Sequence, residues 1–162
     1  MPQVHVVMGS KSDADLVKAS GLIDVLDEVG VSYSVSICSA HRNLPELEKF
    51  ANEACQDGAK VFIGIAGMAA ALPGALAGCT GMAKPIIGVP LDEHGIDSCI
   101  YMPPGVPVLQ SGVGKSGLKN AAIAACQVLA AGDHDVELSL LGYIAKNNKQ
   151  PQFNVDLKEG SS

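Results

Sequence analysis

Val61-Phe62-Ile63-Gly64-Ile65 is the stretch that decides the fold, because it is continuously apolar over the length of a β-strand. Such a run predicts a strand covered on both faces, as in the middle of a parallel sheet. Two similar short runs, His5–Met8 and Ile86–Val89, lie before and after it. The alternating segment Ser32–Ile37 and the segment Val106–Leu109 add two further expected strands.

Helical patterns separate these expected strands. The first helix follows a turn at 9–12, ends at Gly30 and should bury one face made of Leu16, Ala19, Ile23 and Leu26. In the second, Asn43 and Glu46 have the spacing of a capping box, with Pro45 in the first turn. Small-residue and apolar helices follow, and Asp133 can cap a last helix that runs to about Lys146.

The helix expected over Leu118–Ala131 is too apolar for the surface of a monomer, so it is either central or packed against another subunit. Strands that alternate with helices predict an α/β fold, with a parallel sheet, right-handed crossovers and helices on both faces. The 162 residues fit one domain, which we expect over residues 1–149, followed by a C-terminal tail over 150–162.

Composition restricts the class of partner. The net charge of −6 disfavours nucleic acid, whose phosphates need clustered Lys and Arg, but leaves room for a small anionic ligand held by local donors and helix N-termini. There is no spacing of His, Cys or acidic residues typical of a metal site. We therefore expect a small-molecule ligand, no nucleic acid and no metal.

Cysteine usage and hydropathy indicate the compartment. The five cysteines are odd in number and form no CxxC, which favours the reducing cytosol, and the N-terminus lacks a secretory pattern. The uncharged stretch 61–83 is long enough to span a bilayer, but six interruptions break it: Gly64, Gly67, Pro73, Gly74, Gly78 and Gly81. We expect a cytoplasmic protein without a membrane span.

Two polar clusters follow expected strands. Gly9-Ser10-Lys11-Ser12-Asp13 follows the first strand, and Ser39-Ala40-His41-Arg42 follows the second. Ligands of open α/β sheets bind at the carboxyl ends of the strands, so the two clusters predict one site. An imidazole exchanges protons near neutrality, which makes His41 the candidate acid or base.

The Gly9–Asp13 loop allows two interpretations. Amides and hydroxyls at the start of a helix suit a phosphate, but the same residues also make a plain capped turn. Asp13 would repel a phosphate and better suits ribose hydroxyls or an amine. A further stretch, 112–117, matches G-x-G-x-x-G but follows the last expected strand, so it favours a helix-entry loop over a dinucleotide site.

Six segments occur in this order along the chain: Gly9–Asp13, Ser39–Arg42, Leu72–Gly74, Ile87–Pro90, Met102–Val108 and Asn120–Ala122. With these segments the sequence resembles the PurE family, whose members are N5-carboxyaminoimidazole ribonucleotide (N5-CAIR) mutases or aminoimidazole ribonucleotide (AIR) carboxylases. The likeness spans roughly residues 3–147.

The resemblance implies a flavodoxin-like three-layer α/β/α sandwich, a homo-octamer and no cofactor. It implies His41 as the acid/base in a reaction that loses the N-carboxylate as CO2 and traps that CO2 at C4 of the imidazole. Arg42 and the hydroxyls would hold phosphate, Asp13 the ribose, and the 67–72 loop the carboxylate and CO2. The expected substrate-binding residues are Gly9, Ser10, Ser12, Asp13, Ser39, Ala40, Arg42, Gly67, Met68, Ala69 and Leu72.

The chain departs from the common mutase pattern at Ala71, where a histidine is usual, and in a shorter 91–101 stretch. Arg42 and the Ala69–Ala71 run argue against the animal-type carboxylases. The main alternative is direct carboxylation of AIR by CO2. Alternatives from other classes are a non-catalytic nucleotide- or flavin-binding module, disfavoured by the scarcity of aromatic residues, and a phosphorylated receiver domain, which would need paired acids after the first strand.

Overall fold

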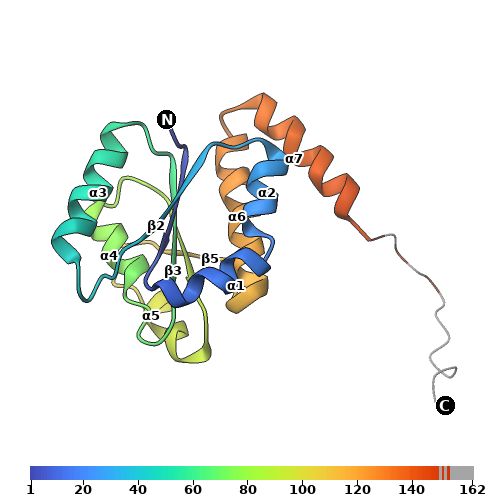
Figure 1. Ribbon diagram of the computed structural model, residues 1–162. Coiled ribbons are helices and arrows are strands. Elements are labelled where there is room, and N and C mark those ends of the chain that lie inside the picture. Colours follow the sequence, from blue (N-terminus) through green and yellow to red (C-terminus); the bar gives the residue numbers. More distant parts are fainter. Residues whose placement is uncertain (150, 152, 154–162) are drawn as a thin grey trace, which may run out of the picture.

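The computed structural model describes residues 1–149, 151 and 153 of the chain. Within these residues the strands form one parallel sheet in the order β2-β1-β3-β4-β5, with helices on both of its faces (Figure 1). The strands are β1 Val4–Met8, β2 Tyr33–Ile37, β3 Val61–Ala66, β4 Ile86–Pro90 and β5 Leu109–Gln110. The helices are α1 Ala14–Ala19, α2 Leu22–Val29, α3 Leu44–Gln56, α4 Leu72–Cys79, α5 Ile96–Ile100, α6 Gly114–Ala130 and α7 His134–Asn147, with 3-10 turns at Lys11–Asp13 and Glu93–Gly95.

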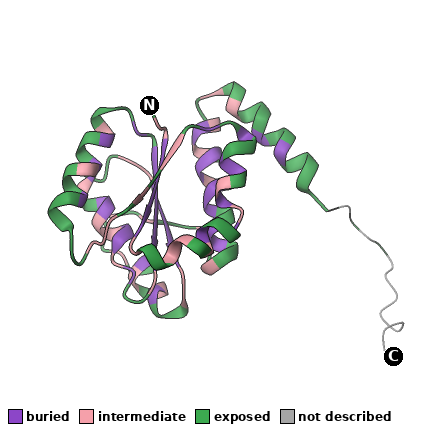
Figure 2. Cartoon of the chain, in the orientation of Figure 1, coloured by how far each residue is buried: buried purple, intermediate pink, exposed green. Residues whose placement is uncertain are grey.

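The predicted three-layer parallel fold is confirmed. Every residue of β3 is buried, as its unbroken apolar run predicts (Figure 2). One core layer joins the sheet to α2, α6 and α7, and the other joins it to α3 and α4. The last expected strand is shorter than predicted, because only Leu109 and Gln110 pair with β4. The expected tail at 150–162 lies outside the described residues, apart from Pro151 and Phe153.

Helix α6 is central, which decides between the two interpretations of its apolar sequence. It packs against β3 and β4 and is covered in turn by α2 and α7. Most of its buried residues are small, among them Gly117, Ala121, Ala122, Ala125 and Cys126, and such residues let the helix lie close to its neighbours. The uncharged stretch 61–83 forms β3, a loop and α4. Within residues 1–149, no helix combines the length and hydropathy that a membrane crossing requires.

The first helix differs from its prediction, because it is broken in two at Gly21. Gly21 has φ 82°, in the left-handed region that favours glycine, and the Ser20 hydroxyl ends α1 by donating to the Val17 carbonyl at 2.6 Å. The break shifts the helical phase. Val17 and Leu22 are therefore buried, whereas Ala19, expected on the buried face, is exposed.

The prediction of a capping box at the start of α3 is wrong, because its hydrogen bonds do not form. Asn43 occupies the N-cap position and Pro45 lies in the first turn, as predicted, but the Asn43 side chain makes no cap hydrogen bond within the described structure. Its backbone (φ −133°, ψ 40°) is not the extended conformation that places a capping side chain over the first turn. Asn43 instead bonds through its backbone N–H to the Ser39 carbonyl at 2.8 Å.

His5 is a structural residue of β1. Its Nδ1 lies 2.8 Å from the Ser34 hydroxyl, and its ring stacks on Phe62 with 5.2 Å between ring centroids. Burial lowers the pKa of His5 from its ordinary value of 6.5, so the fold favours the neutral ring.

Helix α4 lies very close to the sheet over a pair of glycines. Gly64 of β3 and Gly88 of β4 are partners in the strand register, and Pro73 of α4 lies over both. A Cβ added at Gly64 would lie 3.1 Å from Pro73 Cα and 3.1 Å from Leu76 Cδ1. A Cβ added at Gly88 would lie 3.2 Å from Pro73 Cβ. The two glycines therefore set how closely α4 approaches the sheet.

We predict that Gly64→Ala lowers the free energy of unfolding by about 1–3 kcal/mol, because the new methyl group forces α4 outward. Gly142→Ala is the matched control, since a Cβ at this position in α7 meets no atom within 4 Å and alanine favours a helix. Urea unfolding of both variants measures the difference. Equal stability of Gly64→Ala and the wild-type protein would show that α4 can accommodate a methyl group at this position, which would contradict the prediction.

Candidate active site

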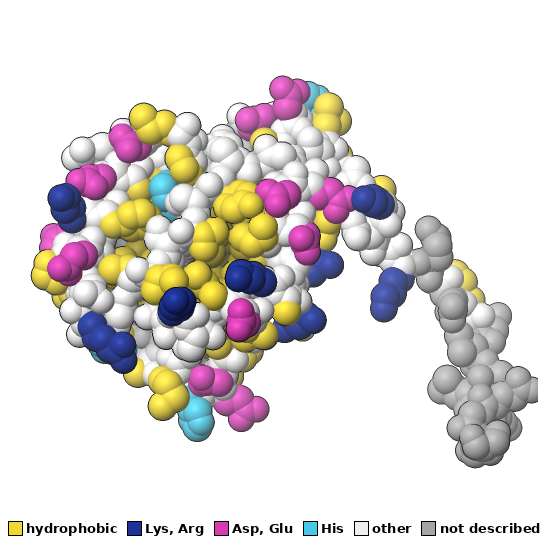
Figure 3. All heavy atoms as spheres, in the orientation of Figure 1, with side chains coloured by type: hydrophobic (Ala, Val, Ile, Leu, Met, Phe, Trp, Pro, Cys, Tyr) yellow, Lys and Arg dark blue, Asp and Glu magenta, His cyan; other side chains and the backbone are white. Residues whose placement is uncertain are grey.

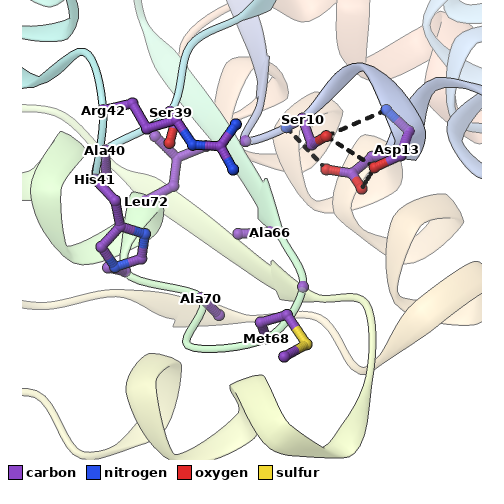
Figure 4. Close-up of a pocket in the computed structure, with 14 residues that line it drawn as sticks. Ser10, Asp13, Ser39, Ala40, His41, Arg42, Ala66, Met68, Ala70 and Leu72 are labelled. Atoms are coloured by element: carbon purple, nitrogen blue, oxygen red, sulfur yellow. Dashed lines mark hydrogen bonds between the residues drawn. The ribbon is translucent and has the colours of Figure 1, made fainter.

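One pocket of about 280 Å³ lies where the chain leaves β1, β2 and β3. Register explains why these three segments meet: Met8 pairs with Ile37 on one side and Ile65 on the other, so the neighbouring strands end at the same level. The pocket is lined by Gly9, Ser10, Ser12, Asp13, Ser39, Ala40, His41, Arg42, Ala66, Gly67, Met68, Ala70, Ala71 and Leu72 (Figure 4).

The first junction, Gly9–Asp13, is a hydrogen-bonded turn. The Gly9 N–H donates to the Ile65 carbonyl at 2.9 Å, which anchors the turn to β3. The Ser10 side chain accepts from the Ser12 N–H at 3.3 Å, and the two hydroxyls lie 2.8 Å apart. The capped-turn interpretation of this loop is therefore confirmed. Both hydroxyls still lie on the pocket wall, where they can also reach a ligand.

Asp13 closes this turn from its other end. One carboxylate oxygen accepts from the Ser10 N–H at 3.1 Å, and the other accepts from the Ser12 hydroxyl at 3.3 Å (Figure 4). These bonds fix the orientation of the carboxylate at the pocket wall. Because each carboxylate oxygen can accept more than one hydrogen bond, Asp13 retains capacity for hydroxyl groups of a ligand.

The second junction, Ser39–Arg42, presents the groups that can move a proton and bind an anion. The Ser39 carbonyl accepts from the Arg42 N–H at 3.3 Å and from the Asn43 N–H at 2.8 Å, which forms a tight turn before α3. His41 and Arg42 are exposed on this turn. In Figure 4 the Arg42 guanidinium extends toward the Ser10–Asp13 turn, whereas the His41 ring is directed away from it, on the side of Leu72.

The third junction, residues 67–71, is apolar and strained. Met68 and Ala70 have φ values of 53° and 39°, in the left-handed region that costs a residue with a Cβ roughly 1 kcal/mol. The Met68 N–H donates to a carboxylate oxygen of Asp92, which lies outside the loop, at 3.1 Å. This hydrogen bond is the main reason why the pKa of Asp92 lies below its ordinary value. The loop thus forms an apolar wall opposite the polar turns.

Two helices begin at or just beyond the pocket lining. α3 begins at Leu44, two residues after Arg42, and α4 begins at Leu72, which lines the pocket. Backbone N–H groups of a helix's first turn are unpaired and favour negative charge. Together with the Arg42 guanidinium, they make an anionic ligand feasible despite the net charge of −6. Within the described residues, no group of three or more metal-ligating side chains occurs.

Most residues singled out from the sequence lie in this pocket. The exception is Ala69, which is exposed and does not line it, because the left-handed residues on either side turn it outward. Sequence reasoning placed Ala70 and Ala71 in the site only as part of the 67–72 loop, and it missed Ala66. Ala66 could have been found from strand length, since it is the last residue of β3, but alanine itself carries no chemical signal.

Comparisons with known proteins agree with this geometry. A family model described as AIR carboxylase matches residues 3–150. The N5-carboxyaminoimidazole ribonucleotide mutase of Bacillus subtilis is 41% identical over 145 residues, which is 86% of this chain and 87% of that protein. The mutase of Methanocaldococcus jannaschii is 38% identical over 152 residues, or 91% of each chain.

A solved structure, Treponema denticola PurE, superposes with a TM-score of 0.77 at 28% identity and covers 91% of this chain and 92% of its own. The resemblance to the PurE family is therefore confirmed. Because the family model matches residues 3–150 and the alignments cover 87% of the Bacillus subtilis mutase and 92% of Treponema denticola PurE, this chain belongs to the AIR carboxylase family.

Proposed function

We propose that this protein is an N5-CAIR mutase that moves a carboxylate from N5 to C4 of the aminoimidazole ring. The observation that carries this proposal is the single pocket that holds the Gly9–Asp13 turn, His41 and Arg42 together. Curated relatives about 40% identical over most of the chain bear the name of this mutase, which supports it.

The polar side of the pocket is the proposed ribonucleotide site. Arg42 extends toward Ser10, whose hydroxyl lies 2.8 Å from that of Ser12. A phosphate between them would receive a charge-assisted hydrogen bond from Arg42, and neutral ones once the two hydroxyls turn from each other and from Asp13 toward it. Asp13 would accept from the ribose hydroxyls, since its carboxylate is oriented by the turn and keeps acceptor capacity.

The apolar side of the pocket is the proposed place for CO2. The N5–carboxylate bond breaks, N5 takes up a proton and CO2 is released beside the imidazole. Carbon C4 then attacks CO2, a C–C bond forms, and His41 removes the proton from C4. The proton that N5 gains balances the one that C4 loses. Ala66, Ala70 and Leu72 offer CO2 no strong partner and exclude water that would compete for it.

Direct carboxylation of AIR by CO2 is the second candidate, because the matching family is described as AIR carboxylase. The two reactions share the C4 attack and the His41 proton transfer, and they differ only in where CO2 comes from. The same pocket would therefore serve both.

Assembly into a homo-octamer in the cytoplasm is proposed on the family resemblance. Exposed apolar side chains support assembly: Val35 and Ile37 of the edge strand β2 are 44% and 51% exposed. Figure 3 shows hydrophobic side chains gathered on the face that carries this strand. Light scattering of the full chain gives the mass, and a monomer would contradict the octamer.

Substrate supply separates the two candidate reactions. We predict that the purified protein converts N5-CAIR to the 4-carboxy product without added bicarbonate, and that AIR with bicarbonate is turned over much more slowly. Chromatography of the products measures both rates. Faster turnover of AIR with bicarbonate would contradict the mutase and support the carboxylase. Absence of both reactions would support a non-catalytic binding module.

His41→Asn should lower kcat at least 100-fold, because the amide cannot take the C4 proton, whereas KM should change little. His134→Asn is the matched control, since His134 lies on the exposed start of α7 beside Glu137 and far in sequence from the pocket. Steady-state rates with N5-CAIR provide the comparison. Wild-type turnover by His41→Asn would remove His41 from the mechanism.

A further inference from the structure

The loop at 67–71 is held in place mainly from outside. Its own backbone contributes one hydrogen bond, from the Ala70 N–H to the Gly67 carbonyl at 3.1 Å. Within the loop this is the one backbone hydrogen bond that supports the left-handed Met68 and Ala70, and the Met68 side chain adds little packing because it is 72% exposed. A loop that lines a reaction pocket in a strained conformation needs further support.

Asp92, which follows β4, supplies that support. One carboxylate oxygen accepts from the Met68 N–H at 3.1 Å, and the other accepts from the His94 N–H at 3.0 Å. The second bond caps the 3-10 turn at Glu93–Gly95. The Asp92 side chain therefore joins the loop after β3 to the loop after β4, and both carboxylate oxygens take part.

Two glycines let the loops approach closely enough for this bridge. A Cβ at Gly67 would lie 3.0 Å from the Asp92 carboxylate, and one at Gly95 would lie 2.7 Å from Ala70 Cβ and 3.1 Å from the Met68 carbonyl. Gly95 and Ala70 are both buried at this contact. Hydrogen bonds and packing thus act on the same two residues, Met68 and Ala70, whose backbone is strained.

We propose that Asp92 is a positioning residue for carboxylate transfer: it holds the 67–71 loop in its strained conformation, so that the apolar wall faces the reacting carboxylate and CO2. This inference rests on the proposed function for the identity of the reacting group. The loop lies across the pocket from Arg42 and the Ser10–Asp13 turn, which would bind the phosphate and ribose. Asp92 should therefore affect the chemical step more than substrate binding.

Two variants of Asp92 test this proposal. Asp92→Ala removes both hydrogen bonds, and Asp92→Asn lacks one acceptor, so it cannot serve Met68 and His94 together. We expect kcat to fall at least tenfold in Asp92→Ala with KM within threefold of wild type, and an intermediate fall in Asp92→Asn. Glu93→Gln is the matched control, because Glu93 is the exposed neighbour in the same turn and should keep wild-type kcat.

Amide hydrogen exchange gives a readout that does not need turnover. Exchange at 67–71 should become faster in both Asp92 variants, while exchange in β1 and β3 stays as in wild type. Three results would each overturn the positioning role of Asp92: unchanged exchange at 67–71, a kcat within twofold of wild type, or a KM that rises by as large a factor as kcat falls. If the wild-type protein turns over neither N5-CAIR nor AIR, the proposed function fails, and exchange alone decides whether Asp92 holds the loop.

Discussion

The contact of α4 with the Gly64–Gly88 pair is the constraint on which the site depends. Because neither strand carries a side chain at this point, Pro73 lies directly over the sheet and the beginning of α4 is brought down beside the end of β3. Residues 67–71 connect β3 to α4 in this position, and two of them adopt left-handed backbone. The place of the pocket's apolar wall therefore depends on this close packing.

The two sides of the pocket have different chemical characters because they come from different strands. The junctions after β1 and β2 carry hydroxyls, a carboxylate, an imidazole and a guanidinium, whereas the junction after β3 carries small apolar residues. A ligand with a charged, hydroxylated end and a small apolar reacting group matches this division. The proposed ribonucleotide and its CO2 have these two properties, and the aligned strand ends place them side by side.

Sequence reasoning predicted features that local pattern determines. The apolar run at 61–65 predicted the sheet, and the polar clusters at 9–13 and 39–42 predicted the site, because parallel strands end at one edge. Prediction from the sequence failed for features that contacts between distant segments determine. The break at Gly21 and the outward turn of Ala69 depend on backbone angles that several sequences could adopt. Asp92 was missed because its partner, Met68, lies 24 residues away in a different loop.

A crystal structure with the 4-carboxyaminoimidazole ribonucleotide product bound tests most directly whether one ligand contacts the junctions after β1, β2 and β3 together. We expect the phosphate between Arg42 and the Ser10–Ser12 hydroxyls, and the carboxylated imidazole between His41 and the 67–72 loop. A phosphate bound at the 67–72 loop, or a ligand that leaves His41 without contact, would contradict this expectation.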